Sequence, residues 1–126
     1  MNVSLFKTIK DTTGGHQIAI TDMFDSIING HWIDHVDKVR QATTKTEQRE
    51  LKKSVPYFTP SGTFQHRRDD GLVHHSGIIA IDIDDLDDPK DVKSWLALDR
   101  FSWFTCESVS GNGLVVFVKI DPTKHR

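Results

Sequence analysis

The sequence contains Gly77-Ile78-Ile79-Ala80-Ile81-Asp82-Ile83-Asp84, an apolar run that ends in two alternating carboxylates. A short apolar run of this kind predicts a buried strand. Because side chains alternate between the two faces of a strand, Asp82 and Asp84 are expected on one face and the neighbouring isoleucines on the other. With about 3.3 Å of rise per residue, the Cα atoms of the two aspartates lie roughly 6.6 Å apart. Both carboxylates are then close enough to bind one divalent ion or a pair of ions.

A second informative stretch, Ser110-Gly111-Asn112-Gly113, separates two further apolar runs. On its own it is typical of a tight hairpin connection, which Asn-Gly favours. A glycine-rich turn also exposes backbone N–H groups that can bind a phosphate. Together with the carboxylate pair, this turn points to metal-assisted nucleotide chemistry.

Around these stretches the sequence predicts an α+β domain in which helices pack on one face of a mainly antiparallel sheet. Residues 3–9 predict a first strand, and Thr21 or Asp22 is expected to cap a helix that ends at Asn29-Gly30. Residues 32–42 are expected to be helical, and a further helix is expected at the capping-box pair Thr44 and Glu47. The later expected strands are residues 63–66, 77–84, 103–109 and 113–120. A helix is expected over residues 89–98, with Asp88 as its cap and with an inner face formed by Val92, Trp95, Leu96 and Leu98.

The length of the chain suits one domain with its own core. We expect residues 1–54 to form a mainly helical part and residues 55–126 to form the motif-bearing sheet. The single cysteine, Cys106, excludes an internal disulfide and fits a reducing compartment. No apolar segment has the length of a signal peptide core or a membrane span, so the cytoplasm is the expected location. Residues 122–126 have the pattern of a helix start, which indicates a domain truncated at its C-terminus.

Charge is segregated along the chain, although the net charge is only −2. Residues 38–68 contain eight Lys and Arg against two Glu, a net charge of +6, whereas residues 69–99 contain nine Asp against two Lys, a net charge of −7. This pattern fits a surface that binds phosphates beside a site that binds metal. The basic segment equally fits the solvated face of a helix. Its candidate nucleic-acid-binding residues are Lys52, Lys53, Arg67 and Arg68.

The acidic segment 82–88 allows three interpretations. It can hold a catalytic metal through Asp82 and Asp84, bind calcium adventitiously, or form an Asp-rich turn that caps the next helix. The calcium interpretation is weak because the spacing and the glycine of an EF-hand loop are missing. The later aspartates are expected to serve the turn and the cap. Asp82 and Asp84 differ from them, because a carboxylate within an apolar strand is costly to bury without a cation.

Other reactive side chains show no catalytic motif. His31 and His35 have i, i+4 spacing, but the glutamate of the zinc-protease arrangement is missing. His74 and His75 precede the predicted strand, where an exposed strand entry is the simpler interpretation. Cys106 is expected to pack within its strand. The sequence contains no Walker A motif, no dinucleotide fingerprint and no zinc-ligand cluster.

The order and spacing of these segments resemble those of the archaeo-eukaryotic primase and primase–polymerase superfamily. The shared pattern is a strand ending in Asp-x-Asp, a helix, a strand, and Ser-Gly-x-Gly opening another strand. In more detail, the chain resembles the VirE N-terminal domain family, a primase-like module of bacterial, especially Bacteroidetes, mobile-element proteins. The resembling segments are residues 55–64, 75–84 and 110–118.

This resemblance implies an RRM-like catalytic sheet and a site that binds a nucleoside triphosphate through Mg²⁺ or Mn²⁺. Asp82 and Asp84 would match the first, metal-binding motif, and Ser110-Gly111-Asn112-Gly113 would match the second motif, which contacts the triphosphate. In such chemistry the metals orient the attacking 3′-hydroxyl and neutralise charge on the leaving pyrophosphate. The resemblance further implies single-stranded nucleic acid as a partner, a helicase-like ATPase domain in the parent protein, and a role in initiating replication of a mobile element.

Two departures from the superfamily pattern bear on activity. The position two residues after the second glycine, which usually holds a histidine, is Val115, and no third acidic residue follows on a later strand. The leading hypothesis is therefore a primase-like nucleotide- or nucleic-acid-binding module that is degenerate as an enzyme. Two rival hypotheses are a non-catalytic nucleic-acid or protein interaction domain that uses no metal, and a metal-dependent nuclease or phosphatase that uses Asp82 and Asp84.

Overall fold

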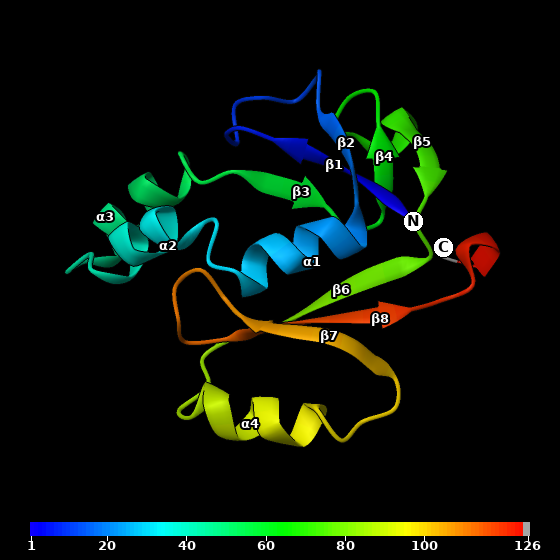
Figure 1. The fold of residues 1–126 in the computed structure, drawn as a ribbon. Coiled ribbons are helices and arrows are strands. Elements are labelled where there is room, and N and C mark those ends of the chain that lie inside the picture. Colours follow the sequence, from blue (N-terminus) through cyan, green and yellow to red (C-terminus); the bar gives the residue numbers. More distant parts are fainter. Residues whose placement is uncertain (125–126) are drawn as a thin grey trace.

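Three small antiparallel sheets and four α-helices make up residues 1–124, the part of the chain that the structure, a computed structural model, describes (Figure 1). The predicted α+β class and the antiparallel strand pairing are confirmed. The strands are β1 (Asn2–Phe6), β2 (His16–Ala19), β3 (Tyr57–Thr59), β4 (Gly62–Phe64), β5 (Leu72–His75), β6 (Ile78–Ile83), β7 (Ser102–Glu107) and β8 (Leu114–Lys119). The α-helices are α1 (Ile20–Ile28), α2 (Ile33–Arg40), α3 (Lys45–Lys52) and α4 (Pro89–Leu96), and short 3₁₀ turns lie at η1 (Asp69–Gly71) and η2 (Pro122–Lys124).

The sheets are ordered β2-β1-β3, β4-β5 and β6-β8-β7. In Figure 1 the β2-β1-β3 sheet lies above α1 and the β6-β8-β7 sheet lies below it. α4 lies on the far side of the β6-β8-β7 sheet and packs against β7, while α2 and α3 pack together at one end of the molecule. The strands thus form three separate sheets rather than the one sheet that the sequence predicts. The β6-β8-β7 sheet carries both sequence motifs. Within residues 1–124, no helix combines the length and the apolar character that a membrane span requires.

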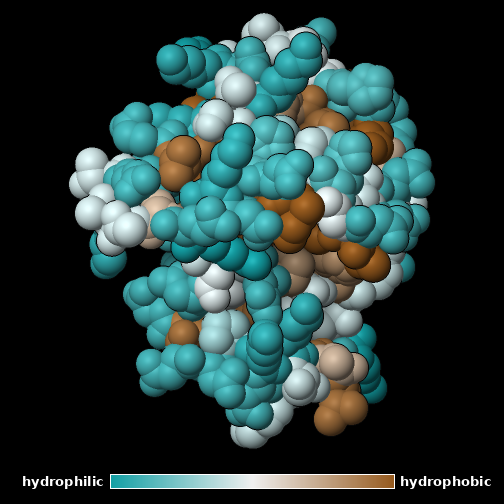
Figure 2. Space-filling model, turned by 60° about the vertical axis from the view of Figure 1, so that its left-hand side comes forward, coloured by the Kyte–Doolittle hydropathy of each residue, from teal (hydrophilic) through white to brown (hydrophobic). Residues whose placement is uncertain are grey.

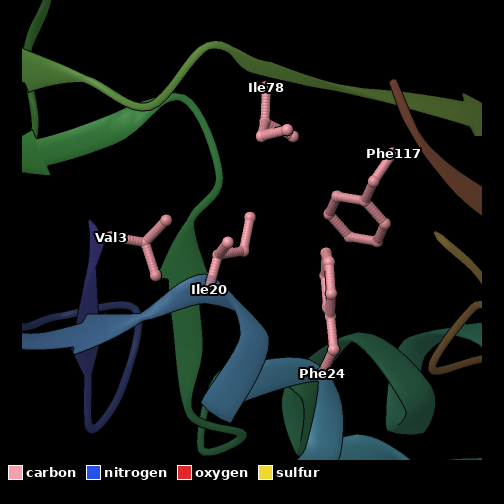
Figure 3. Packing of buried hydrophobic residues seen from close by; sticks show 5 residues of the cluster. All are labelled: Val3, Ile20, Phe24, Ile78 and Phe117. Atoms are coloured by element: carbon pink, nitrogen blue, oxygen red, sulfur yellow. The ribbon is translucent and has the colours of Figure 1, made fainter. Parts of the chain in front are cut away.

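The main hydrophobic core joins α1 to the sheets above and below it (Figure 3). Phe24 on α1 points toward Phe117 on β8, and their ring centroids are 5.0 Å apart. The ring of Phe24 also stacks on Phe104, with 4.0 Å between the centroids. These contacts hold α1 against one end of the β6-β8-β7 sheet. The buried members of the cluster are Val3, Ile20, Phe24, Ile78 and Phe117.

An irregularity in the β7–β8 ladder turns two consecutive aromatic side chains toward α1. The register shifts between Ser102 and Phe104, so Trp103 does not follow the simple alternation of a strand. Trp103 contacts Phe24 edge-on at 5.4 Å, beside the stacked ring of Phe104. The Lys119 ammonium nitrogen lies 4.2 Å from the centre of the Trp103 ring, which adds a cation–π contact.

Local capping signals place two helices as predicted. Thr44 caps α3, because its side chain accepts a hydrogen bond from the Glu47 amide at 3.1 Å. Asp88 caps α4 by accepting from the Asp91 amide at 3.2 Å, and Pro89 occupies the first helical position. Both caps satisfy amides that no carbonyl within the helix can reach.

The start of α1 differs from the prediction. The helix begins at Ile20 with Ala19 as its N-cap, no side chain caps it, and Thr21 and Asp22 lie inside the helix. The reason is that β2 runs directly into α1. The Ile20 amide donates to the Met1 carbonyl at 2.9 Å, so a strand contact satisfies one of the first amides of the helix.

The inner face of α4 also differs from the prediction. Val92 and Leu96 are half-buried, but Trp95 is 74% exposed and Leu98 is 89% exposed. α4 packs against β7, an edge strand, so the covered face of the helix is narrow. The helix ends at Leu96, and Leu98 therefore lies beyond its last turn.

The expected helix start near the C-terminus is a single 3₁₀ turn over Pro122–Lys124. Asp121 holds this turn, because its carboxylate accepts from the Thr123 amide at 3.0 Å and from the Thr123 hydroxyl at 2.7 Å. These bonds hold the pKa of Asp121 below its usual value. The last part of the predicted segment, residues 125–126, lies outside the described residues.

Candidate nucleotide-binding site

An open cleft of about 910 Å³ lies between α1, α2 and the β6-β8-β7 sheet. Its wall is largely apolar, and Figure 2 shows apolar surface gathered at mid-height on one face of the molecule. Its floor is the sheet face that also carries the aromatic core residues. Residues that line the wall include Met23, Ile27, Trp32, Ile33, Val36 and Phe58.

Asp82, Val115 and Cys106 form one row across the floor of this cleft. Asp82 on β6 pairs with Val115 on β8, and Val115 pairs with Cys106 on β7. Directly opposed residues share a face of the sheet, and all three residues line the cleft. The position that holds a histidine in the superfamily pattern is therefore the cross-strand neighbour of Asp82, and here it is the apolar Val115.

Asp84 does not join Asp82 in the cleft. β6 ends at Ile83, and Asp85 has a left-handed φ of 54°, so the chain turns away directly after Asp84. Asp84 is exposed and does not line the cleft, whereas Asp82 is exposed and does. Because neither aspartate is buried, the argument that a cation must offset the cost of burying the pair does not apply. Within residues 1–124, no group of three or more His, Cys, Asp or Glu side chains is placed to hold a metal ion.

The Ser110–Gly113 turn and the acidic segment lie against each other, as their sequence context predicts. A Cβ added to Gly113 would be 2.5 Å from the Ile83 carbonyl oxygen and 3.4 Å from the Asp84 Cα. The amide of Leu86 also donates to the carbonyl of Asn112 at 2.8 Å. The close backbone approach requires glycine at position 113, and it brings the two motifs to the same end of the sheet.

The turn uses much of its hydrogen-bonding capacity internally. The Gly111 amide donates to the Ser108 carbonyl at 2.9 Å, and the Gly113 amide donates to the Ser108 hydroxyl at 3.1 Å. The Ser110 hydroxyl donates to the Asn112 side-chain oxygen at 2.8 Å. Gly111 has a φ of 86°, which glycine adopts without strain. Two of the amides that the phosphate-nest prediction invokes therefore already have acceptors.

Arg40 is a residue of the site that the sequence motifs did not reveal. It is the last residue of α2, it lines the cleft, and its Nη2 donates to the Ser108 carbonyl at 2.9 Å. Its Nε donates to the Val109 carbonyl at 3.3 Å, and its Nη2 lies 3.8 Å from a Glu107 carboxylate oxygen. The only sequence signal was its place in the basic segment 38–68, which carries no information on contacts with residues far along the chain.

Cys106 is a packed thiol rather than an activated one. Burial raises the pKa of the Cys106 thiol above its usual value, and the nearby Lys93 and Arg40 only partly oppose this shift. The thiol is therefore protonated at neutral pH and is a poor nucleophile. This agrees with the prediction that Cys106 packs within its strand.

The predicted nucleic-acid-binding residues do not line the cleft. The Lys53 carbonyl accepts from the Ile9 amide at 3.3 Å, and the Arg67 amide donates to the Thr12 carbonyl at 2.8 Å. The residues near the end of α3 and those after β4 therefore meet on the same loop, residues 7–15. Lys53 also pairs with Glu50 at 2.8 Å. The four candidates, none of which lines the cleft, are Lys52, Lys53, Arg67 and Arg68.

Two of the histidines that the sequence singled out take structural positions. His31 packs edge-on against Trp32, with 4.4 Å between the ring centroids. His75 lies on β5, and its Nδ1 accepts a hydrogen bond from the Gly77 amide at 2.9 Å. Neither histidine lines the cleft.

Residues 50–126 match the family model described as BT4734-like, N-terminal domain, and this match covers more than half of the chain. The expected VirE N-terminal family is therefore wrong, because the family that matches is a different one. No curated protein and no solved structure matches the chain. The mobile-element setting and the helicase-like ATPase rested on the VirE resemblance, and both remain expectations. The matched region contains both sequence motifs, whereas Arg40 lies before it.

Proposed function

We propose that this chain, which belongs to the BT4734-like N-terminal domain family, is a primase-like module that binds a nucleoside triphosphate in the cleft. One observation carries the proposal. Asp82 lies on the cleft floor, and the Ser110–Gly113 turn packs directly against the end of the same strand. A carboxylate and a glycine-rich turn at one end of a sheet can hold the metal-bound phosphates of a nucleotide.

The carboxylates suit a divalent ion that the substrate helps to hold. Mg²⁺ in phosphate-binding sites is usually bound through one or two carboxylates together with phosphates and water, rather than by a cage of protein ligands. Asp82 would supply one such carboxylate to Mg²⁺ or Mn²⁺ in the cleft, whereas Asp84, which does not line the cleft, could contribute only from the end of the strand. The absence of a group of three or more ligands among residues 1–124 is compatible with this mode. The ion would supply charge neutralisation at the phosphates.

The residues beside Asp82 favour binding over nucleotide transfer. Its cross-strand neighbour Val115 can neither donate nor accept a proton, and the next residue in the row is the protonated Cys106 thiol. The row therefore offers no general base at neutral pH beside the carboxylate. We accordingly propose a module that recognises nucleotides and is degenerate as an enzyme.

The proposal predicts that nucleotide affinity depends on a divalent ion and on Asp82. ATP and dATP are titrated into the chain with Mn²⁺ and with EDTA, for the wild type and for Asp82→Asn, Asp84→Asn and Asp87→Asn. Because charge-assisted contacts are worth about 1.5–3 kcal/mol, Asp82→Asn should weaken binding about tenfold or more in Mn²⁺. Asp87→Asn removes the same charge from the exposed acidic segment and should leave binding unchanged. Equal affinity in all four proteins would refute the role of the aspartate pair.

A second candidate function is the binding of single-stranded nucleic acid at the surface around the 7–15 loop, which does not line the cleft. Its support is that the 7–15 loop joins the end of α3 to the segment that follows β4, which gathers basic residues from separate parts of the sequence. Arg67 stacks over the Tyr57 ring at 5.1 Å, and such exposed cation–aromatic pairs are common where bases and phosphates bind.

This second function predicts binding that ignores metal and falls with salt. Fluorescently labelled single-stranded DNA is titrated into the wild type, Arg67→Gln/Arg68→Gln and the control Lys90→Gln/Arg100→Gln, neither residue of which lines the cleft. The first double variant should lower the slope of log affinity against log salt by about 1.4, since each phosphate contact on a single strand contributes about 0.7. The control should keep the wild-type slope. A slope unaffected by Arg67 and Arg68 would remove this candidate.

A further inference from the structure

Arg40 stands between the cleft and the Ser110–Gly113 turn. It lines the cleft, whereas none of the four residues of the turn does. On its other side it packs against the turn, since a Cβ added to Gly111 would be 3.3 Å from the Arg40 Nε. A ligand in the cleft therefore meets the guanidinium of Arg40 before it meets the turn.

The turn offers less to an anion than its sequence indicates. The amides of Gly111 and Gly113 donate within the turn, to the Ser108 carbonyl and hydroxyl. The carbonyls of Ser108 and Val109 point at Arg40, which neutralises an edge that would otherwise repel a phosphate. Recognition of negative charge at this end of the cleft thus falls to Arg40.

Arg40 retains both charge and hydrogen-bond donors for a ligand. A guanidinium has five N–H donors, and Arg40 uses two of them on neutral carbonyl oxygens. The Glu107 carboxylate lies 3.8 Å away, beyond hydrogen-bonding distance, so it neutralises the guanidinium only in part. The Arg40 side chain is 33% exposed, which leaves it accessible from solvent. A guanidinium held by two backbone carbonyls is also pre-oriented, as bidentate phosphate recognition requires.

At the opposite end of α2 from Arg40, the aromatic side chain of Trp32 lines the cleft. Trp32 precedes the helix and lines the cleft, about 12 Å from Arg40 along the helix at 1.5 Å of rise per residue. Its indole N–H is buried and has no hydrogen-bond acceptor among residues 1–124. Ile33 and Val36 line the wall between Trp32 and Arg40. This arrangement suits a ligand with a planar, partly apolar group at one end and an anionic group at the other.

We propose that Arg40 is the phosphate-recognition residue of the cleft and that it orients a nucleotide with its phosphates at Arg40 and its base toward Trp32. This assignment rests on the proposed nucleotide-binding function and adds the orientation in which the nucleotide binds. Arg40 acts as a ligand-binding residue, and Ser108 and Val109 act through it by fixing the guanidinium.

The test compares ligands that share only part of a nucleotide. Tripolyphosphate, ATP and adenosine are titrated by calorimetry into the wild type and Arg40→Gln, with Arg49→Gln on α3 as a charge-matched control outside the cleft. Tripolyphosphate is measured in EDTA, so that its binding does not depend on the aspartates. Arg40→Gln should weaken tripolyphosphate and ATP about tenfold or more and adenosine less than about twofold, while Arg49→Gln matches the wild type.

The outcomes separate this inference from the proposed function. If the wild type binds ATP but Arg40→Gln and Arg49→Gln behave alike, Arg40 has no phosphate role and the inference is overturned, while the proposed function stands. If tripolyphosphate binding depends on Arg40 but ATP binding ignores Mn²⁺ and Asp82, the inference is supported and the proposed function fails. If the wild type binds neither tripolyphosphate nor ATP, both fail.

A measurement on the wild type covers the case in which Arg40→Gln does not fold. Phenylglyoxal modifies accessible guanidinium groups, and peptide mass analysis reports each arginine separately. Tripolyphosphate should slow modification of Arg40 at least about threefold and leave Arg49 unaffected, as expected when a bound anion covers one guanidinium. Equal modification of Arg40 with and without tripolyphosphate would overturn the inference.

Discussion

One face of the β6-β8-β7 sheet has a packed end and an open end, and β8 passes through both. At the packed end Phe117 is buried against the rings of Phe24 on α1, Phe58 on β3 and Phe104 on β7. Two residues earlier on the same strand and face, Val115 lies half-exposed on the cleft floor beside Asp82. The difference in burial between Phe117 and Val115 shows that α1 covers the sheet at one end only. Polar side chains at the other end therefore stay accessible.

The largest effect should come from the packed end. Phe117→Ala removes a buried ring that contacts Phe24, Phe58 and Phe104, and it should lower the free energy of unfolding by about 3–5 kcal/mol. Val115→Ala is the matched control on the same strand and face, and it should cost about 1 kcal/mol or less because Val115 is half-exposed. Urea denaturation of both variants measures the contrast. Similar losses for the two variants would mean that the open end is as tightly packed as the aromatic end.

An intermediate effect is expected where the two motifs touch. Gly113→Ala places a Cβ against the Ile83 carbonyl, a backbone atom that cannot move without shifting the end of β6. We expect a loss of about 1–3 kcal/mol in the free energy of unfolding. Gly14→Ala is the comparison: its left-handed φ of 68° strains an alanine but nothing lies within 4 Å of the added Cβ, whereas Gly113 has the close contact without a left-handed φ. If Gly113→Ala is no worse than Gly14→Ala in urea denaturation, the close approach of the motifs is not tight.

The smallest effect concerns Cys106, which pairs with Val115 across the floor of the open end. Burial raises the folded-state pKa of its thiol above the unfolded value, so the folded state holds the proton more tightly. The resulting stability is present below the unfolded pKa of about 8.5 and is lost as the pH rises through the folded pKa. The difference in unfolding free energy between the wild type and Cys106→Ala should therefore shrink above about pH 8.5. A difference that stays constant up to pH 10 would contradict a buried, protonated thiol.

Local sequence signals predicted the parts of the fold that depend on near neighbours. The caps at Thr44 and Asp88 each need one side chain and an amide three residues away, so the pattern alone identifies them. The prediction for α1 was wrong because the bond from the Ile20 amide to the Met1 carbonyl joins residues that no local pattern relates. The prediction for α4 was wrong in part because an apolar helix face cannot report how much of it an edge strand will cover, as Trp95 shows.

The candidate site also combines residues that local sequence predicted with residues that only contacts between distant parts of the chain bring together. Asp82 and the Ser110–Gly113 turn were predicted from the sequence, and the structure places them at one end of one sheet. Arg40 could not be predicted, because its acceptors Ser108 and Val109 are 68 and 69 residues away along the chain. Asp84 was expected beside Asp82 by strand alternation, but the ladder ends at Ile83 and Asp84 does not line the cleft.

Short-range sequence patterns predicted the α+β class and most of the helices and strands. They also predicted that the Asp-x-Asp strand lies close to the glycine-rich turn. These features were predictable because strand alternation, helix caps and turn residues act within a few positions of the chain. Three things depended on tertiary structure: the division into three sheets, the open end of the cleft, and the placement of Arg40 on the turn. Each depends on which surfaces α1 and α2 cover, and that is settled by packing between residues far apart in the chain. The aromatic cluster around Phe24 sets where α1 rests on the sheet, and therefore where the covered face stops and the cleft begins.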